Sequence, residues 1–178
     1  MRLRGRHHEG GPLRTLRFGA RTFVPVALAG AVLFGPASSP PVAASTTTTE
    51  AQQIIRIAKN QIADPWRYGA DGPRAFDCSG LVRFAFRRAD DGRVVRAGRL
   101  HSASALLRWF RDHGKASRHH PKRGDLVIWG DGSHVGIYIG DGKAISTLRS
   151  GVRVHRVNAL TAPFTAYLHT GMSTKSAD

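Results

Sequence analysis

Long apolar runs are scarce in this chain of 178 residues. The most apolar segment, "FVPVALAGAVLF" at residues 23–34, is twelve residues long, whereas a membrane-spanning helix needs roughly 20. An arginine-rich stretch precedes it and the small-residue run "GPASSPPVAAS" follows it. A secretory signal peptide has a basic segment, then an apolar segment, then small residues at the cleavage site. We therefore expect residues 1–44 to be a signal peptide that is cleaved near Ala44. An uncleaved anchor is the alternative.

Acidic residues are also few, with 12 against 27 lysines and arginines and a formal net charge of +15. Removal of residues 1–44 takes away six arginines and one glutamate and leaves +10. Such a charge attracts polyanions, and outside a cell it points to anionic wall polymers or a membrane surface as partners. Nucleic acid is not expected, because the basic region 87–123 has no aromatic platform interleaved with its basic residues on which bases could stack. A solvated basic surface is the alternative; the arginines in question are Arg87, Arg88, Arg93, Arg96 and Arg99.

Cysteine is nearly absent, since Cys78 is the only one. An exported chain with one thiol cannot close an internal disulfide, so the thiol indicates pairing between molecules or a reactive group. A plainly buried cysteine is the alternative, because cysteine is among the most buried residue types.

The rest of the chain reads as one domain. We expect a polar linker at residues 45–50, a domain at 51–172 and a tail at 173–178. Thr49 and Gln52 form a capping-box pattern before apolar residues at helical spacing. Further helices are predicted from about Cys78 to Ala89 and from Ser102 to a stop at Gly114.

Short β-type runs separated by glycine-rich turns follow these helices. Helices first and strands afterwards predict an α+β domain, with N-terminal helices packed on an antiparallel sheet. The runs are "LVIWG", "HVGIYIG", "KAISTL", "VRVHRV" and "FTAYLHTG".

Cys78 is predicted to lie in the first turn of a helix, directly after Asp77. Unpaired backbone N–H groups and the helix dipole stabilise a thiolate there. Gly80, two residues later, allows another chain to come close. This placement favours a nucleophile, which needs a base.

His134 is the best candidate among nine histidines. It begins a run in which Val135, Ile137 and Ile139 alternate with His134, Gly136 and Tyr138. We expect the first set to face a core and the second to face outward or into a cleft. A surface histidine is the alternative.

Three blocks, "FDCSGLV", "KRGDLVIW" and "SHVGIYIGDGKAI", resemble the NlpC-type cell-wall peptidases, which are papain-like cysteine peptidases. The resemblance covers residues 51–148. It implies a papain-like fold, hydrolysis of amide bonds in peptidoglycan stem peptides (usually beside a D-γ-glutamyl residue) and no metal or organic cofactor. It also implies that Cys78 is the nucleophile, that His134 is the base, and that Asp77 and Ser79 help hold the amine end of the stem peptide.

Two positions depart from that family's pattern. The third polar residue, twelve positions after the base and most often histidine, is Ser146 here. A serine is too short to reach the imidazole in the same way, so we expect it to act through one water. Trp66 stands where the family usually has tyrosine, in a substrate-binding position; its indole N–H donates but cannot accept.

Strand register decides whether Ser146 shares a face with His134. The Asp141-Gly142 pair favours a two-residue turn. In that register the residue numbers of cross-strand partners sum to 283, and Ser146 points away from the His134 face. A three-residue loop makes the sum 282 and puts Ser146 on the His134 face. We adopt the second register because it agrees with the family's spacing.

His155 and Asn158 are reserve candidates for the third role, although His155 is expected to face solvent. Two functions remain: a secreted cysteine endopeptidase acting on peptidoglycan, with no membrane span after processing, or a cell-wall-binding module with little or no activity.

Overall fold

The computed structural model describes residues 48–96 and 99–174. The predicted signal peptide at 1–44 lies outside the described residues, as do the first part of the predicted linker and residues 175–178 of the predicted tail.

Three helices form where the sequence predicts them: α1 (Glu50–Lys59), α2 (Cys78–Arg88) and α3 (Ala103–Asp112). Each begins after a residue whose side-chain oxygen accepts a backbone N–H bond from the first turn: Thr49, Asp77 and Ser102. Thr49 and Gln52 form both bonds of the expected capping box. No helix in residues 48–96 and 99–174 is long and apolar enough to cross a lipid bilayer.

The strands form a single antiparallel sheet in the order β1-β6-β2-β3-β4-β5. The five expected strands are present; the short β1 and a 3₁₀ turn, η1 (Gly130–Gly132), were not predicted. The expected α+β architecture, with helices on an antiparallel sheet, is confirmed. The strand bounds are β1 (Ala116–Ser117), β2 (Leu126–Trp129), β3 (His134–Gly140), β4 (Lys143–Leu148), β5 (Gly151–Arg156) and β6 (Phe164–Leu168).

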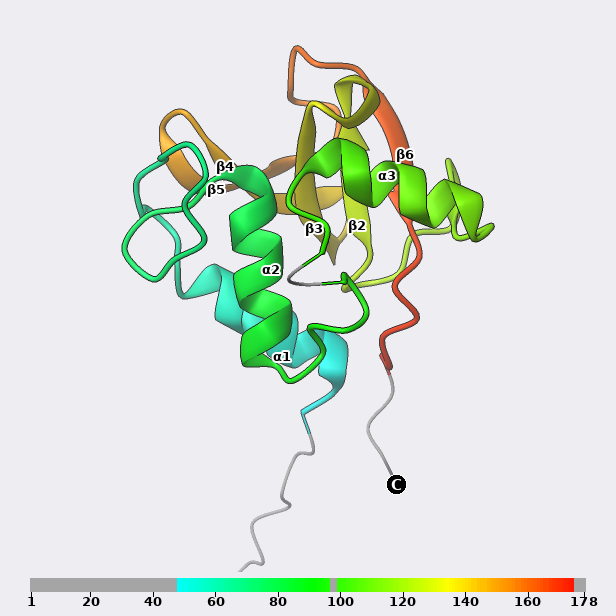
Figure 1. The fold of residues 1–178 in the computed structure, drawn as a ribbon, viewed down its shortest axis with the longest axis horizontal. Coiled ribbons are helices and arrows are strands. Elements are labelled where there is room, and N and C mark those ends of the chain that lie inside the picture. The colour runs from blue at the N-terminus through cyan, green and yellow to red at the C-terminus, as the bar shows by residue number, and fades with distance from the viewer. Residues whose placement is uncertain (1–47, 97–98, 175–178) are drawn as a thin grey trace, which may run out of the picture. The chain divides into compact units, whose positions relative to one another are not determined.

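The sheet is buried on both faces, which the sequence did not predict. On one face α1 and α2 lie side by side and α2 packs against β3, as Figure 1 shows. The large core there contains Val135 and Ile137 together with apolar residues of all three helices. The opposite face carries a second, smaller core built from Val127, Trp129, Tyr138, Ala144 and Val157.

The β3–β4 hairpin combines features of both predicted registers. Its turn has two residues, Asp141 and Gly142, both with positive φ, because Gly140 pairs with Lys143. The register shifts between Tyr138 and Gly140, so that Tyr138 pairs with Ala144 and the sum becomes 282. The predicted three-residue loop is therefore wrong, and a bulge produces the register that it was meant to explain.

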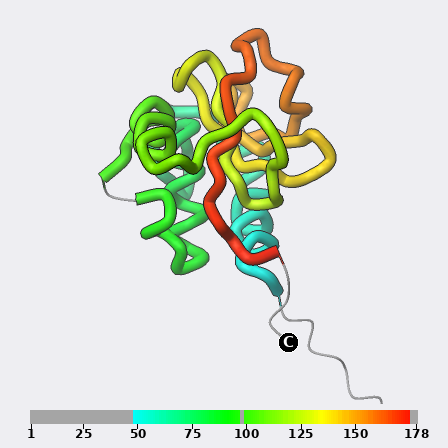
Figure 2. Tube along the Cα trace, turned by 90° about the vertical axis from the view of Figure 1, so that its right-hand side faces the viewer, coloured from blue at the N-terminus to red at the C-terminus, as the bar shows by residue number. Residues whose placement is uncertain are grey.

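The two ends of the described chain meet. The Ala51 N–H donates to the Ser173 carbonyl oxygen at 3.2 Å, and the Ser173 N–H donates to Glu50 Oε2 at 2.8 Å. Figure 2 shows the red C-terminal segment running beside the start of the cyan helix α1. The segment that follows the last strand is thus tied to the start of the first helix.

Candidate active site

Cys78 is the first residue of α2 and is half-buried. Asp77 caps the helix through Gly80, and the Asp77 N–H donates to the Ala70 carbonyl oxygen at 2.7 Å. A Cβ added at Gly80 would lie 2.0 Å from that same Ala70 oxygen, which explains the glycine as a point of close chain approach. The loop around residue 70 and the start of α2 are therefore held together immediately beside the thiol.

The electrostatics of the thiol differ from the expectation. Burial raises the pKa of Cys78 above its ordinary value; backbone N–H groups, foremost that of Val135, oppose this rise, and Asp77 adds to it. The helix terminus alone therefore does not produce a resting thiolate. The bond from the Val135 N–H does place the sulfur at the start of β3, beside His134.

His134 begins β3 and lines the same cleft as Cys78. Burial, and secondarily the neighbouring His155, lower its pKa to about 4. The imidazole is therefore neutral at physiological pH. Since the thiol pKa is raised, the resting pair consists of a thiol and a neutral base.

Ser146 lies on the His134 face, as the chosen register predicts, but it contacts the imidazole directly and needs no bridging water. Its Oγ is 2.9 Å from His134 Nε2, and Ser146 is fully buried. The close approach depends on Gly136, where an added Cβ would lie 2.9 Å from Ser146 Cβ and 2.8 Å from the Ile145 carbonyl oxygen. A short serine suffices because the two strands come close at this glycine.

His155 was wrongly expected to face solvent. Its Nε2 lies 2.8 Å from Ser146 Oγ, and its ring lies 5.5 Å from that of Trp129. The prediction failed because the second core around Trp129 and Val157 covers this face of the sheet. The other reserve residue, Asn158, is exposed.

The cleft encloses about 530 Å³. Its lining includes five of the residues proposed from the sequence, namely Trp66, Asp77, Cys78, Ser79 and His134. Ser146 lies behind His134 and is not part of the lining. Trp66 forms part of its wall, and the Arg149 guanidinium stacks at 4.0 Å from the Trp66 ring centroid. Sequence reasoning missed Arg149, since nothing in "STLRSG" links it to residue 66. The remaining lining includes Tyr68, His101, Ser102, Ser133 and Thr147.

Asp77 and Ser79 line the cleft but also hold its wall together. Asp77 Oδ1 accepts the Gly80 N–H and Oδ2 accepts the Gly69 N–H at 3.0 Å. The buried Ser79 hydroxyl lies 3.0 Å from both Asp77 Oδ1 and the His101 carbonyl oxygen. These bonds join both ends of the cleft to the start of α2.

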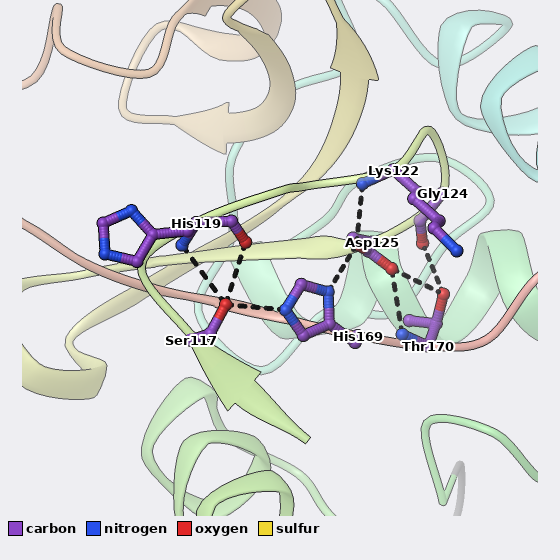
Figure 3. Close-up of polar contacts among 7 residues, drawn as sticks. All are labelled: Ser117, His119, Lys122, Gly124, Asp125, His169 and Thr170. Carbon is purple, nitrogen blue, oxygen red and sulfur yellow. Dashed lines mark hydrogen bonds and ion pairs between the residues drawn. The ribbon is translucent and has the colours of Figure 1, made fainter. Parts of the chain in front are cut away.

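A second polar cluster joins Ser117, His169 and Asp125 by hydrogen bonds that follow one another as in a serine-hydrolase triad, from serine to histidine to aspartate (Figure 3). Ser117 Oγ is 2.8 Å from His169 Nε2, and His169 Nδ1 is 2.9 Å from Asp125 Oδ2. None of the three residues lines the Cys78 cleft. Asp125 also accepts bonds from the Lys122 and Thr170 N–H groups, so the cluster ties β1, β2 and the end of β6 together.

Among the described residues, no group of three or more His, Cys, Asp or Glu side chains is arranged to hold a metal ion.

The antiparallel sheet covered by helices, with the thiol at the start of α2 and the histidine at the start of β3 lining one cleft, has the arrangement of a papain-like fold. The model of the NlpC/P60 family matches residues 63–171, and the chain belongs to this family.

Named relatives agree with this assignment. The chain is 35% identical over 127 residues to murein DD-endopeptidase MepH of Escherichia coli, covering 63% of this chain and 45% of the relative. It is 33% identical over 153 residues to peptidoglycan endopeptidase RipB of Mycobacterium tuberculosis, covering 70% and 58%. The matched region thus spans about half the length of such relatives.

Solved structures show the same fold. The structure of RipB from M. tuberculosis is 26% identical with a TM-score of 0.53 and covers 68% of this chain and 64% of that one. The NlpC/p60 domain of the peptidoglycan hydrolase SagA is 24% identical with a TM-score of 0.53, covering 66% and 97%.

Proposed function

We propose that this chain is a cysteine endopeptidase that hydrolyses amide bonds in the stem peptides of peptidoglycan. The observation that carries the proposal is that Cys78 and His134 line one cleft and that the sulfur is held at the N–H of Val135, the residue next to His134. The names of the relatives, which are endopeptidases of murein and peptidoglycan, support the substrate.

The proposed reaction begins from the neutral pair. As Cys78 Sγ attacks the scissile carbonyl carbon, the free nitrogen of His134 takes the thiol proton. The carbonyl oxygen becomes an oxyanion at the first-turn N–H groups of α2, which carry the positive end of the helix dipole. Collapse breaks the C–N bond, and the leaving amine takes the proton back from His134. Water, deprotonated by the same imidazole, then hydrolyses the thioester and restores the thiol.

Trp66, Asp77 and Ser79 are proposed to bind the substrate from the wall of the cleft. The cleft is open enough to admit a peptide, and Arg149 above Trp66 adds a positive charge that suits a carboxylate on a stem peptide.

The decisive test compares the wild type with Cys78→Ala on purified peptidoglycan, with the products identified by mass spectrometry. We expect the variant to release no peptide fragments while keeping the wild-type melting temperature, because a half-buried thiol contributes little packing. Arg111→Gln, an exposed change in α3, is the matched control and should digest normally. Equal digestion by Cys78→Ala and the wild type would refute the peptidase. Loss of digestion in both, with salt-sensitive wall binding retained, would favour the binding module.

Export is the second part of the proposal. The basic, apolar and small segments of residues 1–44 support a secreted or wall-associated protein. Mass spectrometry of the protein recovered from culture medium should find a new N-terminus near Ser45. Recovery of full-length chain only in the membrane fraction would favour the uncleaved anchor.

Anionic wall polymers are the proposed additional partner. A depression of about 250 Å³ is lined by Arg93, Arg96 and Lys115 around Trp109. None of these three cations forms an ion pair with an acidic side chain of the described residues. Arg93→Gln with Lys115→Gln should weaken retention on polymer-bearing walls at low salt, whereas Arg56→Gln with Lys59→Gln, an equal loss of charge on α1, should not. Equal retention of both double variants would refute this surface.

A further inference from the structure

Three neighbouring strands each contribute one residue to a chain of hydrogen bonds behind the cleft. His134 of β3 lies 2.9 Å from Ser146 of β4, and Ser146 lies 2.8 Å from His155 of β5. The chain ends at the backbone, since His155 Nδ1 is 3.0 Å from the Arg156 carbonyl oxygen. The sequence assigned the third role to Ser146 and kept His155 only as a reserve candidate, whereas the structure links the His155 imidazole to Ser146.

The direction of these bonds follows from the chemistry of the last group. A carbonyl oxygen only accepts, so His155 Nδ1 must carry a proton and donate. A neutral imidazole has one N–H, which leaves His155 Nε2 as an acceptor. The Ser146 hydroxyl therefore donates to His155.

The same reasoning fixes the tautomer of His134. Ser146 has one hydroxyl proton, and that proton is committed to His155. Ser146 Oγ must then accept from His134 Nε2–H. A neutral His134 carries no second proton, so its Nδ1 is an unprotonated acceptor and the nitrogen left to receive the proton of Cys78.

Water has little access to Ser146, the middle member of this chain of bonds, whereas the bond from His155 to the Arg156 carbonyl oxygen is exposed. Ser146 is fully buried, and the ring of Trp129 lies 5.4 Å from that of His134 and 5.5 Å from that of His155. The Trp129 indole is itself fixed, because its Nε1–H donates to the Val157 carbonyl oxygen at 2.7 Å. A dry, fixed wall keeps solvent from offering Ser146 a different donor or acceptor.

We propose that His155 is a positioning residue which, through the hydroxyl of Ser146, holds His134 in the Nε2–H tautomer that leaves Nδ1 free to act as the base. This inference rests on the proposed peptidase function for its kinetic consequence, but the tautomer of His134 is a property of the folded chain and is measurable without substrate.

The spectroscopic test uses ¹⁵N-labelled protein and the long-range ¹⁵N–¹H couplings of the imidazoles. In the wild type at neutral pH we expect His134 to give the Nε2–H pattern. In His155→Ala, which removes the acceptor for the Ser146 proton, we expect a mixture of both tautomers. A wild-type His134 with its proton on Nδ1, or an unchanged His134 pattern in His155→Ala, would overturn the proposal whether or not the protein digests peptidoglycan.

The kinetic test uses the same variants. His155→Ala should lower kcat about 10- to 100-fold with KM nearly unchanged, the range seen when outer partners that orient an imidazole are removed. His155→Gln should recover most of the loss, because its amide oxygen can accept the Ser146 proton. His119→Ala, an exposed histidine far from the chain of bonds, is the matched control.

The outcomes separate this inference from the peptidase proposal. Activity in the wild type together with full kcat in His155→Ala would refute the positioning role and leave the peptidase intact. If His155→Ala fails to fold, the tautomer of the wild type and the kcat of His155→Gln decide; a glutamine variant as weak as Ser146→Ala would also count against the proposal.

Discussion

Two clusters in this domain join serine to histidine with bonds of similar length, and they differ in everything else that matters for chemistry. In the cluster around Asp125, hydrogen bonds run from Ser117 to His169 and on to a buried carboxylate, as in a hydrolase triad. In the cleft, His134 is backed by Ser146 and no carboxylate. Of the two clusters, the cleft is the one whose wall also carries a cysteine at a helix terminus, with backbone N–H groups facing the sulfur. A serine, a histidine and a carboxylate linked by hydrogen bonds therefore do not by themselves identify a catalytic site.

The sharpest way to separate the clusters is to remove each histidine. His134→Ala should lower kcat/KM at least about 10³-fold, because it removes general acid–base catalysis from both steps. His169→Ala should keep kcat/KM within about twofold of the wild type once the folded fraction is counted. Peptide release from peptidoglycan, normalised to folded protein, measures both. Equal losses in both variants would erase the distinction between the clusters.

The second comparison concerns stability. Asp125→Asn places an amide where the carboxylate accepts bonds from Lys122, His169 and Thr170, so donors face a donor. We expect a loss of about 3 kcal/mol in the free energy of unfolding, as when one partner of a buried pair is removed. Urea denaturation measures this loss. A Ser117→Ala variant should lose less, and an Asp125→Asn protein as stable as the wild type would contradict the structural role.

The pH dependence follows from the shifted groups of the cleft. The neutral pair persists from the His134 pKa of about 4 to the raised pKa of Cys78, so kcat/KM should rise through pH 4 and stay level into alkaline solution. An acid limb near pH 6.5, the ordinary range of histidine, would contradict the buried, neutral imidazole.

The pH dependence of folding stability also comes from the lowered pKa of His134. As the pH falls, His134 becomes protonated at a higher pH in the unfolded chain than in the folded one. The contribution of neutral His134 to the free energy of unfolding is therefore fully present above about pH 6.5 and is lost towards pH 4, by up to about 3 kcal/mol. His134→Gln should remove this part of the slope, whereas His169→Ala should keep it. Urea denaturation at pH 7, 5.5 and 4.5 provides the measurement.

The smallest expected effect is at the rim of the cleft. Arg149→Gln removes the charge stacked on Trp66. We expect KM to rise about fivefold with kcat unchanged, the loss of roughly 1 kcal/mol typical of one exposed charged contact. Arg111→Gln carries the same charge change outside the cleft and should leave KM as it is. A fall in kcat alone would place Arg149 in a role other than binding.

Local patterns predicted those parts of the domain that local interactions determine. The capping residues Thr49, Asp77 and Ser102 and the apolar spacing after them predicted all three helices. Cys78 could be placed in a first turn because its neighbours alone decide that position. The thiol pKa could not be predicted in the same way, since it depends on burial in the folded domain and on the backbone N–H of Val135, which is distant in the chain.

For Ser146, the candidate for the third polar residue of the site, a correct prediction came from an incorrect loop length. The face of Ser146 was predicted correctly, but a bulge beside Ile139 sets the register and the loop length does not. His155 was misassigned because its alternation with Val152 and Val154 says nothing of the second core that covers that face. Contacts made by residues far apart in sequence decide both points.

The pairing of Ala51 with Ser173 has a practical consequence for engineering. A domain whose first and last described segments touch can be inserted as a unit into a surface loop of a host protein without stretching either partner. The same closure permits circular permutation: a short bridge can join the old ends, and new ends can be opened at the exposed Asp141–Gly142 turn.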